Sequence, residues 1–191
     1  MSKVKAAVFA SGTGSNFQAM LQKKFLEAEI VLLVCDRPDA KVIEIADKYH
    51  IPVYARPPMD FPSKAAYEKK VLKQLQVHRV EWIFLAGYMR LIGDTLLSVF
   101  PNRIINIHPS LLPAFPGKEA IEQAVRAGVK VTGVTIHFVD SGMDTGQIIA
   151  QQAVKMKKGE SLSQLTKRIQ SVEHRLYPET INKLLSRSNG L

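Results

Sequence analysis

Two polar side chains at the end of a predicted strand are spaced so that both could act on one reacting group. Asn106 and His108 stand two positions apart in IINIHP, whose isoleucines are typical of a β-strand and whose Pro109 ends it. Side chains two apart in a strand project from the same face. An amide and an imidazole placed together can donate hydrogen bonds to a developing negative charge and transfer a proton. The alternative is an ordinary polar face of a strand.

A glycine-containing turn near the start of the chain is a second candidate. FASGTGSN lies between a predicted strand and a predicted helix, where backbone N–H groups and the helix dipole favour an anion. The third glycine of the dinucleotide-binding pattern G-x-G-x-x-G would fall on Phe17, which is too bulky for the close packing that this pattern requires. We therefore favour a single phosphate held by Gly14, Ser15 and Asn16. A plain tight turn with a serine N-cap is the alternative.

An acidic loop follows a later strand in HFVDSGMDTG, and its second carboxylate is Asp144. A carboxylate opposite a histidine can stabilise the charged imidazole. We expect the strands that end at His108 and Val139 to share a sheet, with both ends on one edge, which would bring Asp144 beside His108. The alternative is a surface turn, in which Asp and Gly are the usual residues. His137, within the strand, is interpreted as structural.

The segment LAGYMRLI, residues 85–92, ends a predicted buried strand. Gly87 permits a close approach of the backbone, and the apolar residues after it could line a pocket for a flat aromatic ligand. By itself the segment could also be a strand that runs into a helix. The sequence contains no G-x-S-x-G elbow, no cysteine cluster and no H-E-x-x-H pattern, so neither an acyl-serine enzyme nor a metal site is predicted.

Strands and helices alternate along the chain, which predicts an α/β fold with a mainly parallel, twisted sheet flanked by helices. Ligands of such sheets bind beyond the carboxyl ends of the strands, where the candidate segments fall. Ser63 and the pair Ser161 and Gln164 have the pattern of helix N-caps, and Gly128 that of a helix C-cap. The predicted strands are 4–10, 30–35, one near 53, 80–87, 103–108, 131–139 and 147–155, and the predicted helices are 15–27, 40–49, 64–79, 94–100, 118–128 and one from 161.

Composition narrows the class of ligand. The 191 residues, 46% of them hydrophobic, are expected to form a single domain over 1–191. The net charge of +9 favours anionic partners, but the basic residues are spread over predicted helices and the chain has only one tryptophan, which argues against nucleic-acid binding. No run of 18 apolar residues and no signal-peptide core occur, so we expect no membrane span and a cytoplasmic location. Cys35, in an apolar run, is expected to be buried.

These motifs together resemble the phosphoribosylglycinamide formyltransferases, the folate-dependent enzymes of purine synthesis. The resemblance covers nearly the whole chain and rests on SGTGSN, LAGYMRLI, NIHPSLLPAFPG, GVTIHFVDSGMDTGQII and VEHRLYP. NIHPSLLP alone marks the wider formyltransferase superfamily, and SGTGSN points to the glycinamide ribonucleotide branch. The resemblance implies a Rossmann-like formyltransferase fold, whose N-terminal part binds the ribonucleotide phosphate and whose C-terminal part binds folate and carries catalysis.

The resemblance also implies roles for individual residues. Asn106, His108 and Asp144 match the catalytic residues of the family. Positions that bind the ribonucleotide match Gly14, Ser15, Asn16 and Glu173, and positions that bind folate match Lys64, Met89, Arg90, Leu91, Ile92 and again Asn106. Lys64 stands where we expect arginine in some members, so a charge is kept but a bidentate contact is lost.

The implied reaction transfers the formyl group of 10-formyltetrahydrofolate to the amine of glycinamide ribonucleotide, through a tetrahedral intermediate that bears an oxyanion. Asn106 and a protonated His108 would donate hydrogen bonds to this oxyanion, and Asp144 would favour the imidazolium and help to place a water for proton transfer. The mechanism needs no metal and no covalent enzyme intermediate. The implied partners are these two substrates, without nucleic acid or membrane, for a protein that is a monomer or a homodimer.

Two other functions stay open from the sequence. A formyltransferase that acts on methionyl-tRNA would suit the positive charge, although the end of the chain at Leu191 is expected to leave no room for an added RNA-binding domain. A non-catalytic nucleotide-binding module would bind a phosphorylated ligand without needing Asn106, His108 and Asp144. Release of tetrahydrofolate from 10-formyltetrahydrofolate in the presence of glycinamide ribonucleotide separates the three.

Overall fold

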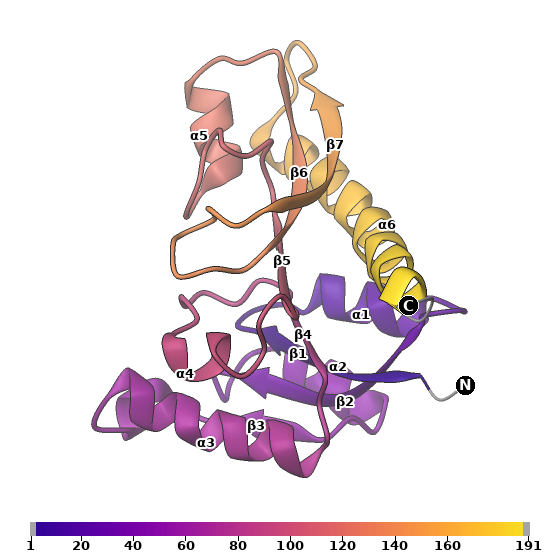
Figure 1. Cartoon of the computed structure of the whole chain (residues 1–191). Coiled ribbons are helices and arrows are strands. Elements are labelled where there is room, and N and C mark those ends of the chain that lie inside the picture. Colours follow the sequence, from indigo (N-terminus) through magenta and orange to yellow (C-terminus); the bar gives the residue numbers. More distant parts are fainter. Residues whose placement is uncertain (1–2, 189–191) are drawn as a thin grey trace.

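The computed structural model describes residues 3–188, and within them seven strands form one sheet in the order β3-β2-β1-β4-β5-β6-β7 (Figure 1). The strands are β1 (Val4–Ala10), β2 (Ala28–Cys35), β3 (Val53–Ala55), β4 (Trp82–Leu85), β5 (Ile104–His108), β6 (Val131–Phe138) and β7 (Ile148–Lys155). The helices are α1 (Ser15–Gln22), α2 (Val42–Lys48), α3 (Lys64–Val77), α4 (Asp94–Leu97), α5 (Ala120–Arg126) and α6 (Leu162–Ser188), with a 3-10 turn η1 (Pro58–Asp60).

The sheet is parallel from β3 to β5, and its last two strands are antiparallel. This arrangement confirms the predicted α/β fold with a mainly parallel sheet. Residues 139–147 join β6 to β7 without a helix, and such a short connection allows only an antiparallel pair. Because β6 also runs antiparallel to β5, Phe138 pairs with Ile105 at the start of β5 and not with His108 at its end. The expectation that β5 and β6 end on the same edge of the sheet is therefore wrong.

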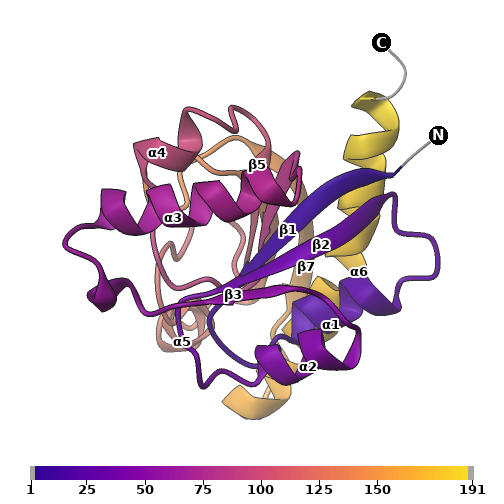
Figure 2. The ribbon, with the colours of Figure 1, turned by 90° about the horizontal axis from the view of Figure 1, so that it is seen from below.

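Helices cover both faces of the sheet. Figure 2 shows α3 and α4 on one side of β1 and β2, and α1 and α2 on the other side. The strands supply alternate side chains to the two layers, as the pleat requires. Along β1, Ala7 and Phe9 belong to the core under α3, whereas Ala6, Val8 and Ala10 belong to the core under α1 and α6. Burial on both faces explains why the parallel strands are continuous apolar runs in the sequence.

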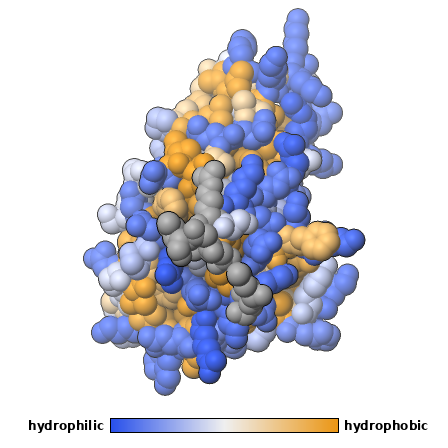
Figure 3. Space-filling model, turned by 45° about the vertical axis from the view of Figure 1, so that its right-hand side comes forward, coloured by the Kyte–Doolittle hydropathy of each residue, from blue (hydrophilic) through white to orange (hydrophobic). Residues whose placement is uncertain are grey.

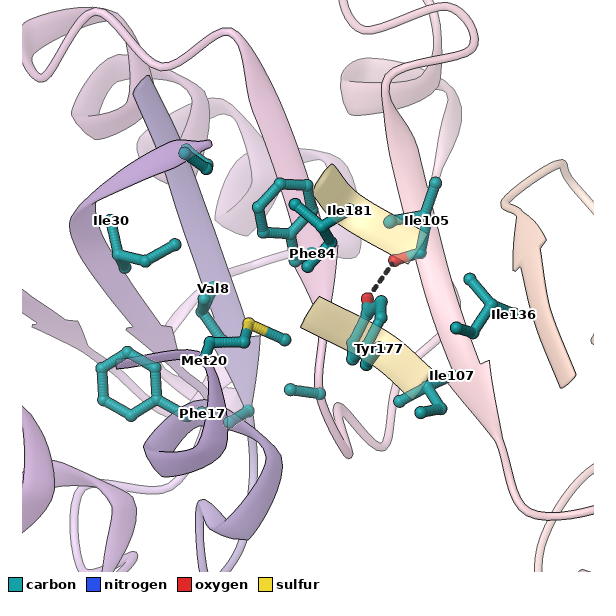
Figure 4. Close-up of a cluster of buried hydrophobic side chains, with 14 of the residues drawn as sticks. Val8, Phe17, Met20, Ile30, Phe84, Ile105, Ile107, Ile136, Tyr177 and Ile181 are labelled. Atoms are coloured by element: carbon teal, nitrogen blue, oxygen red, sulfur yellow. Dashed lines mark hydrogen bonds between the residues drawn. The ribbon is translucent and has the colours of Figure 1, made fainter. Parts of the chain in front are cut away.

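A buried tyrosine ties the longest helix to the centre of the sheet (Figure 4). Tyr177 on α6 is fully buried, and its hydroxyl shares a proton between the carbonyl oxygens of Leu85 at 2.9 Å and Ile105 at 3.1 Å. Burial raises the pKa of this hydroxyl, so it stays a donor. The two hydrogen bonds attach α6 to β4 and β5, the strands whose ends carry LAGYMRLI and the Asn106–His108 pair.

The helix N-caps expected from the sequence are observed, and Gly128, expected as a C-cap, follows the C-cap residue Ala127 of α5. The Ser63 hydroxyl accepts a backbone N–H of the first turn of α3 at 3.1 Å. Ser161 and Gln164 bond reciprocally, with N···O distances of 2.8 and 3.3 Å. The helix ends differ from the prediction by up to three residues elsewhere, and most at α1, which ends at Gln22 although the prediction extended it to residue 27. Residues beyond Gln22 instead connect to β2, and Leu26 among them is buried in the core.

The face of the molecule shown in Figure 3 is mostly hydrophilic, and the one cysteine is buried. On the face shown in Figure 3, charged and polar side chains predominate, and hydrophobic ones form separate patches. Cys35 is fully buried as predicted, and burial raises the pKa of its thiol. Among residues 3–188, no helix is both long and apolar enough to cross a membrane.

Candidate active site

A cavity of about 700 Å³ opens at the carboxyl ends of β1, β4 and β5. Its volume lies within the range of small-molecule sites, and its position is the one expected for an open α/β sheet. The candidate segments from the sequence therefore meet in one place. The lining includes residues 12–16, 85–92, 106–109, 117–120 and 142–144, together with His137, Val139, Gln170 and Glu173.

Asn106, His108 and Asp144 lie together in the wall of this cavity. Oδ1 of Asp144 is 3.4 Å from Nδ2 of Asn106, and Oδ2 is 3.4 Å from Nδ1 of His108. The backbone N–H of Gly117 donates to the same Oδ2 at 2.8 Å. Asp144 has φ +57°, a left-handed conformation that aspartate tolerates better than most residues. The predicted proximity of Asp144 and His108 is observed, but it arises because the loop of residues 139–147 folds back toward the end of β5.

Both ring nitrogens of His108 have partners. Nε2 is 2.8 Å from the carbonyl oxygen of Phe115, which can only accept, so Nε2 carries a hydrogen. Nδ1 faces Asp144 on the other side. Phe115 has φ +56°, which is rare for a bulky residue and typical of functional sites. The loop that contains Phe115 is held by Thr135, whose hydroxyl donates to the carbonyl oxygen of Ser110 at 2.7 Å.

The carboxyl group of Asp144 is ionised at neutral pH. Burial by itself raises its pKa, but hydrogen bonds from His137 and from the N–H of Gly117, with His108 nearby, outweigh burial and hold the pKa below its usual value. An ionised carboxylate only accepts hydrogen bonds, so Nδ2 of Asn106 faces it as a donor, and Nδ1 of His108 donates to it when the ring carries a second proton. The cluster can therefore direct N–H groups at a negative charge and exchange protons with a ligand.

Sequence reasoning missed His137, which belongs to the same polar cluster. His137 is 2% exposed and pairs in register with Asn106 across β5 and β6. Its Nε2 lies 3.3 Å from Nδ2 of Asn106 and 3.5 Å from Oδ1 of Asp144, and its Nδ1 donates to the carbonyl oxygen of Phe138 at 2.7 Å. His137 therefore does more than pack within its strand. The antiparallel register of β5 and β6 places His137 beside Asn106, and no pattern in the sequence predicts this register.

The glycine turn forms another part of the cavity wall. Gly14 has φ +77°, and a Cβ atom there would lie 2.6 Å from Cγ2 of Val42, so both the backbone shape and the packing against α2 require glycine. Phe17 is fully buried, in agreement with the interpretation against a dinucleotide turn. Nδ2 of Asn16 donates to Oε2 of Glu173 at 3.0 Å. Burial raises the pKa of Glu173, although the hydrogen bond from Asn16 acts in the opposite direction.

The residues matched to a folate site divide into two groups. Residues 89–92 line the cavity, whereas Lys64 is not among the lining residues. Lys64 begins α3, and its Nζ lies 4.0 Å from Oε1 of Glu68. The structure therefore does not bring Lys64 to the site. It does bring Gln170, which sequence reasoning missed.

The polar cluster is built for hydrogen bonding. Among the residues that the structure describes, no group of three or more His, Cys, Asp or Glu side chains is placed to hold a metal ion. Amide, imidazole and carboxylate groups at these distances can orient a carbonyl oxygen, stabilise negative charge on it and relay a proton. Those are the tasks of an enzyme that transfers an acyl group directly between two ligands.

By its sequence, the chain is a formyl transferase. The sequence model of the Formyl transferase family matches residues 4–181. The phosphoribosylglycinamide formyltransferase of Bacillus subtilis (strain 168) is 55% identical over 188 residues, which are 97% of this chain and 96% of that protein. The chain belongs to this family of phosphoribosylglycinamide formyltransferases.

Solved structures and longer proteins are consistent with this membership. The crystal structure of phosphoribosylglycinamide formyltransferase from Bacillus halodurans has a TM-score of 0.95 and 55% identity, over 98% of each chain. The trifunctional purine biosynthetic protein adenosine-3 of Drosophila pseudoobscura pseudoobscura is 40% identical over 187 residues, which are 95% of this chain but only 14% of that protein. The similarity to the trifunctional protein therefore concerns one part of it.

Proposed function

We propose that this chain transfers the formyl group of 10-formyltetrahydrofolate to the amine of glycinamide ribonucleotide in de novo purine biosynthesis. The observation that carries the proposal is the cluster of Asn106, His108 and Asp144, with contacts of 3.4 Å, in a cavity that the glycine turn also lines. Family membership and the 55% identity to the Bacillus subtilis enzyme support the same reaction.

The two substrates bind to different walls of the cavity. Gly14, Ser15 and Asn16 hold the ribonucleotide phosphate at the start of α1, where backbone N–H groups and the helix dipole favour an anion. The buried carboxyl group of Glu173, fixed by Asn16, contacts the glycinamide part. Residues 89–92 form the folate wall, together with Asn106. Lys64 does not line the cavity, although its Cε lies close to Gly93 beside this wall, so its contact with folate stays a prediction from the resemblance.

The reaction proceeds by direct attack. The amine nitrogen forms a bond to the formyl carbon, and the carbonyl electron pair moves onto oxygen, which gives a tetrahedral oxyanion. Collapse of this intermediate breaks the bond between the formyl carbon and N10 of the folate, and the proton lost by the amine ends on N10. Atoms and charges balance without an oxidant, a metal or a covalent bond to the enzyme.

The protein stabilises the oxyanion through two N–H donors. Nδ2 of Asn106 and Nδ1 of His108, which donates in the protonated ring that this mechanism requires, lie 3.4 Å from Asp144, longer than the usual range of about 2.7–3.2 Å, so they are available to a stronger acceptor. Losing one such donor typically lowers turnover roughly 10²–10³-fold. The ionised Asp144 orients both donors and holds the water that relays the proton.

The single sheet and the shared cavity support one functional domain over 1–191, in which the N-terminal segment supplies the phosphate turn and the C-terminal segment supplies Asp144 and Glu173. We place this activity in the cytoplasm, where soluble ribonucleotides and folates occur. The protein's partners are then these two small molecules, without nucleic acid or membrane, and it works as a monomer or a homodimer.

The test is release of tetrahydrofolate. The purified protein is mixed with 10-formyltetrahydrofolate and glycinamide ribonucleotide, and the change in folate absorbance is followed together with the mass of the ribonucleotide product. We expect release only when both substrates are present, with one formyl group gained per tetrahydrofolate formed. Release that does not depend on the ribonucleotide, or no release, contradicts the proposal.

A further inference from the structure

The cavity segment of residues 87–93 is held by polar side chains from three separate elements. The Ser11 hydroxyl, after β1, accepts the N–H of Met89 at 3.0 Å. The Glu68 carboxylate, on α3, accepts the N–H of Gly93 at 2.7 Å. The third side chain is Asp36, after β2, which binds the side chain of a cavity residue and not the backbone.

Asp36 makes one strong contact, and that contact is with Arg90. Asp36 is 4% exposed, and its Oδ2 accepts a hydrogen bond from Nε of Arg90 at 2.8 Å. Its other oxygen, Oδ1, is buried without a hydrogen-bond partner in the described part of the chain. The Arg90 side chain is about half exposed and lines the cavity. Burying a carboxylate costs free energy unless the carboxylate is paired. The ion pair with Arg90 therefore explains how a charged Asp36 is tolerated in the interior.

The parallel sheet explains how two distant segments meet. β1 lies between β2 and β4, and all three strands end on the same edge, so Asp36 reaches across the end of β1 to the segment after β4. A charge-assisted bond of this length restricts the Arg90 side chain to one place. It thereby restricts residues 89–92, the part of the wall that we assign to folate.

We infer that Asp36 is a positioning residue for the folate co-substrate, which it affects through Arg90. The inference rests on the proposed function, because it takes residues 89–92 as the folate wall. Asp36 itself is not among the residues that line the cavity. Its role is therefore to hold Arg90 and the backbone beside it in the geometry that binds folate.

The first experiment compares Asp36→Asn with Asp39→Asn. Asp39 is an exposed aspartate in the same loop without a contact to Arg90, so its substitution removes the same charge and serves as the matched control. In Asp36→Asn, the KM for 10-formyltetrahydrofolate should rise roughly three- to tenfold, since the pair is only partly shielded from solvent. The KM for the ribonucleotide and kcat should stay near the wild-type values, and Asp39→Asn should change none of the three.

The second experiment tests whether Asp36 acts through Arg90. In a background of Arg90→Met, Asp36→Asn should have no further effect on the KM for folate, because the bond is already absent. Effects that multiply, or an unchanged folate KM in Asp36→Asn, overturn the inference. If Asp36→Asn does not fold, Arg90→Lys replaces it, since that exposed substitution keeps the charge but loses the Nε donor. It should raise the same KM.

A binding measurement separates this inference from the proposed function. The dissociation constant of 5-formyltetrahydrofolate is measured by calorimetry on wild type, Asp36→Asn and Asp39→Asn. A selective rise in Asp36→Asn supports the inference even if wild type transfers no formyl group, an outcome that would refute only the proposed reaction. Equal dissociation constants in the three proteins, or no folate binding by wild type, overturn the inference.

Discussion

Asp144 lies 3.4 Å from His108, although the strands that precede these two residues end on opposite edges of the sheet. β5 ends at His108, whereas β6 ends beside the start of β5. The loop after β6 bridges this gap, and the backbone N–H of Gly117 donates to the same oxygen of Asp144 that faces His108. The geometry of the candidate site therefore depends on the conformation of a loop as well as on the ends of strands.

Substitution of either N–H donor should lower turnover much more than binding. We expect Asn106→Ala and His108→Ala each to reduce kcat roughly 10²–10³-fold, because the lost hydrogen bond acts on charge that develops only in the transition state. The KM values for both substrates should change far less. Steady-state kinetics decide this, with circular dichroism to confirm folding. Near-normal turnover in either folded variant would mean that these side chains are an ordinary polar face of β5.

His137→Gln should move the acid limb of the activity profile to higher pH. The hydrogen bond from His137 helps to hold the pKa of Asp144 below its usual value, so removing it raises that pKa. Protonation of Asp144 then begins at a higher pH and removes the carboxylate that the reaction needs. The measurement is kcat/KM from about pH 3 to 8, a range that reaches below the usual pKa of an aspartate. An acid limb that coincides with that of wild type would show that His137 does not act on Asp144.

The lowered pKa of Asp144 also predicts a pH-dependent stability. Because this pKa is lower in the folded protein than in the unfolded chain, ionisation of Asp144 stabilises the fold above the unfolded value of about 4. That contribution is lost as the pH falls through the folded pKa. The difference in free energy of unfolding between wild type and Asp144→Asn should therefore be constant near neutrality and shrink below about pH 4. Urea unfolding at several pH values measures it, and a difference that does not shrink counts against an ionised Asp144.

Recognition of the ribonucleotide should depend on its phosphate. The turn of Gly14, Ser15 and Asn16 begins a helix and lines the cavity, which is the geometry of an anion site. Glycinamide ribonucleotide should bind far more tightly than the dephosphorylated riboside, and inorganic phosphate should compete only with the former. Calorimetric titrations provide the comparison. Similar dissociation constants for the two ligands would show that this turn does not bind the phosphate.

Gly14→Ala should destabilise the protein, and Gly12→Ala should not. Alanine at position 14 would combine a positive φ with a Cβ atom 2.6 Å from Val42, and the backbone term alone costs roughly 1–2 kcal/mol. A Cβ atom on Gly12 would meet nothing within 4 Å, so Gly12→Ala is the matched control. Thermal unfolding of the two variants is the measurement. Equal melting temperatures would show that the turn tolerates a side chain at Gly14.

Local features could be predicted from the sequence because their causes are local. The alternation of apolar residues places Asn106 and His108 on one face of β5, and the hydroxyl of Ser63 caps α3 within a single turn. The bulk of Phe17 at a glycine position predicted a residue packed in the core, and its side chain is part of the core. Each of these inferences needs only neighbouring residues and the period of a strand or helix.

Tertiary structure decided the contacts between distant segments. The direction and register of β6 against β5 brought His137 next to Asn106, and the fold of the loop after β6 brought Asp144 to His108. Lys64 was assigned by resemblance to the site, yet it lies outside the cavity. Apolar alternation is the same whether neighbouring strands run parallel or antiparallel, so it shows which face a residue occupies and not which residue faces it across the sheet. The sequence by itself therefore determined the class of fold and the chemical groups of the site, and only the pairing of strands and the folding back of one loop determined how these groups meet.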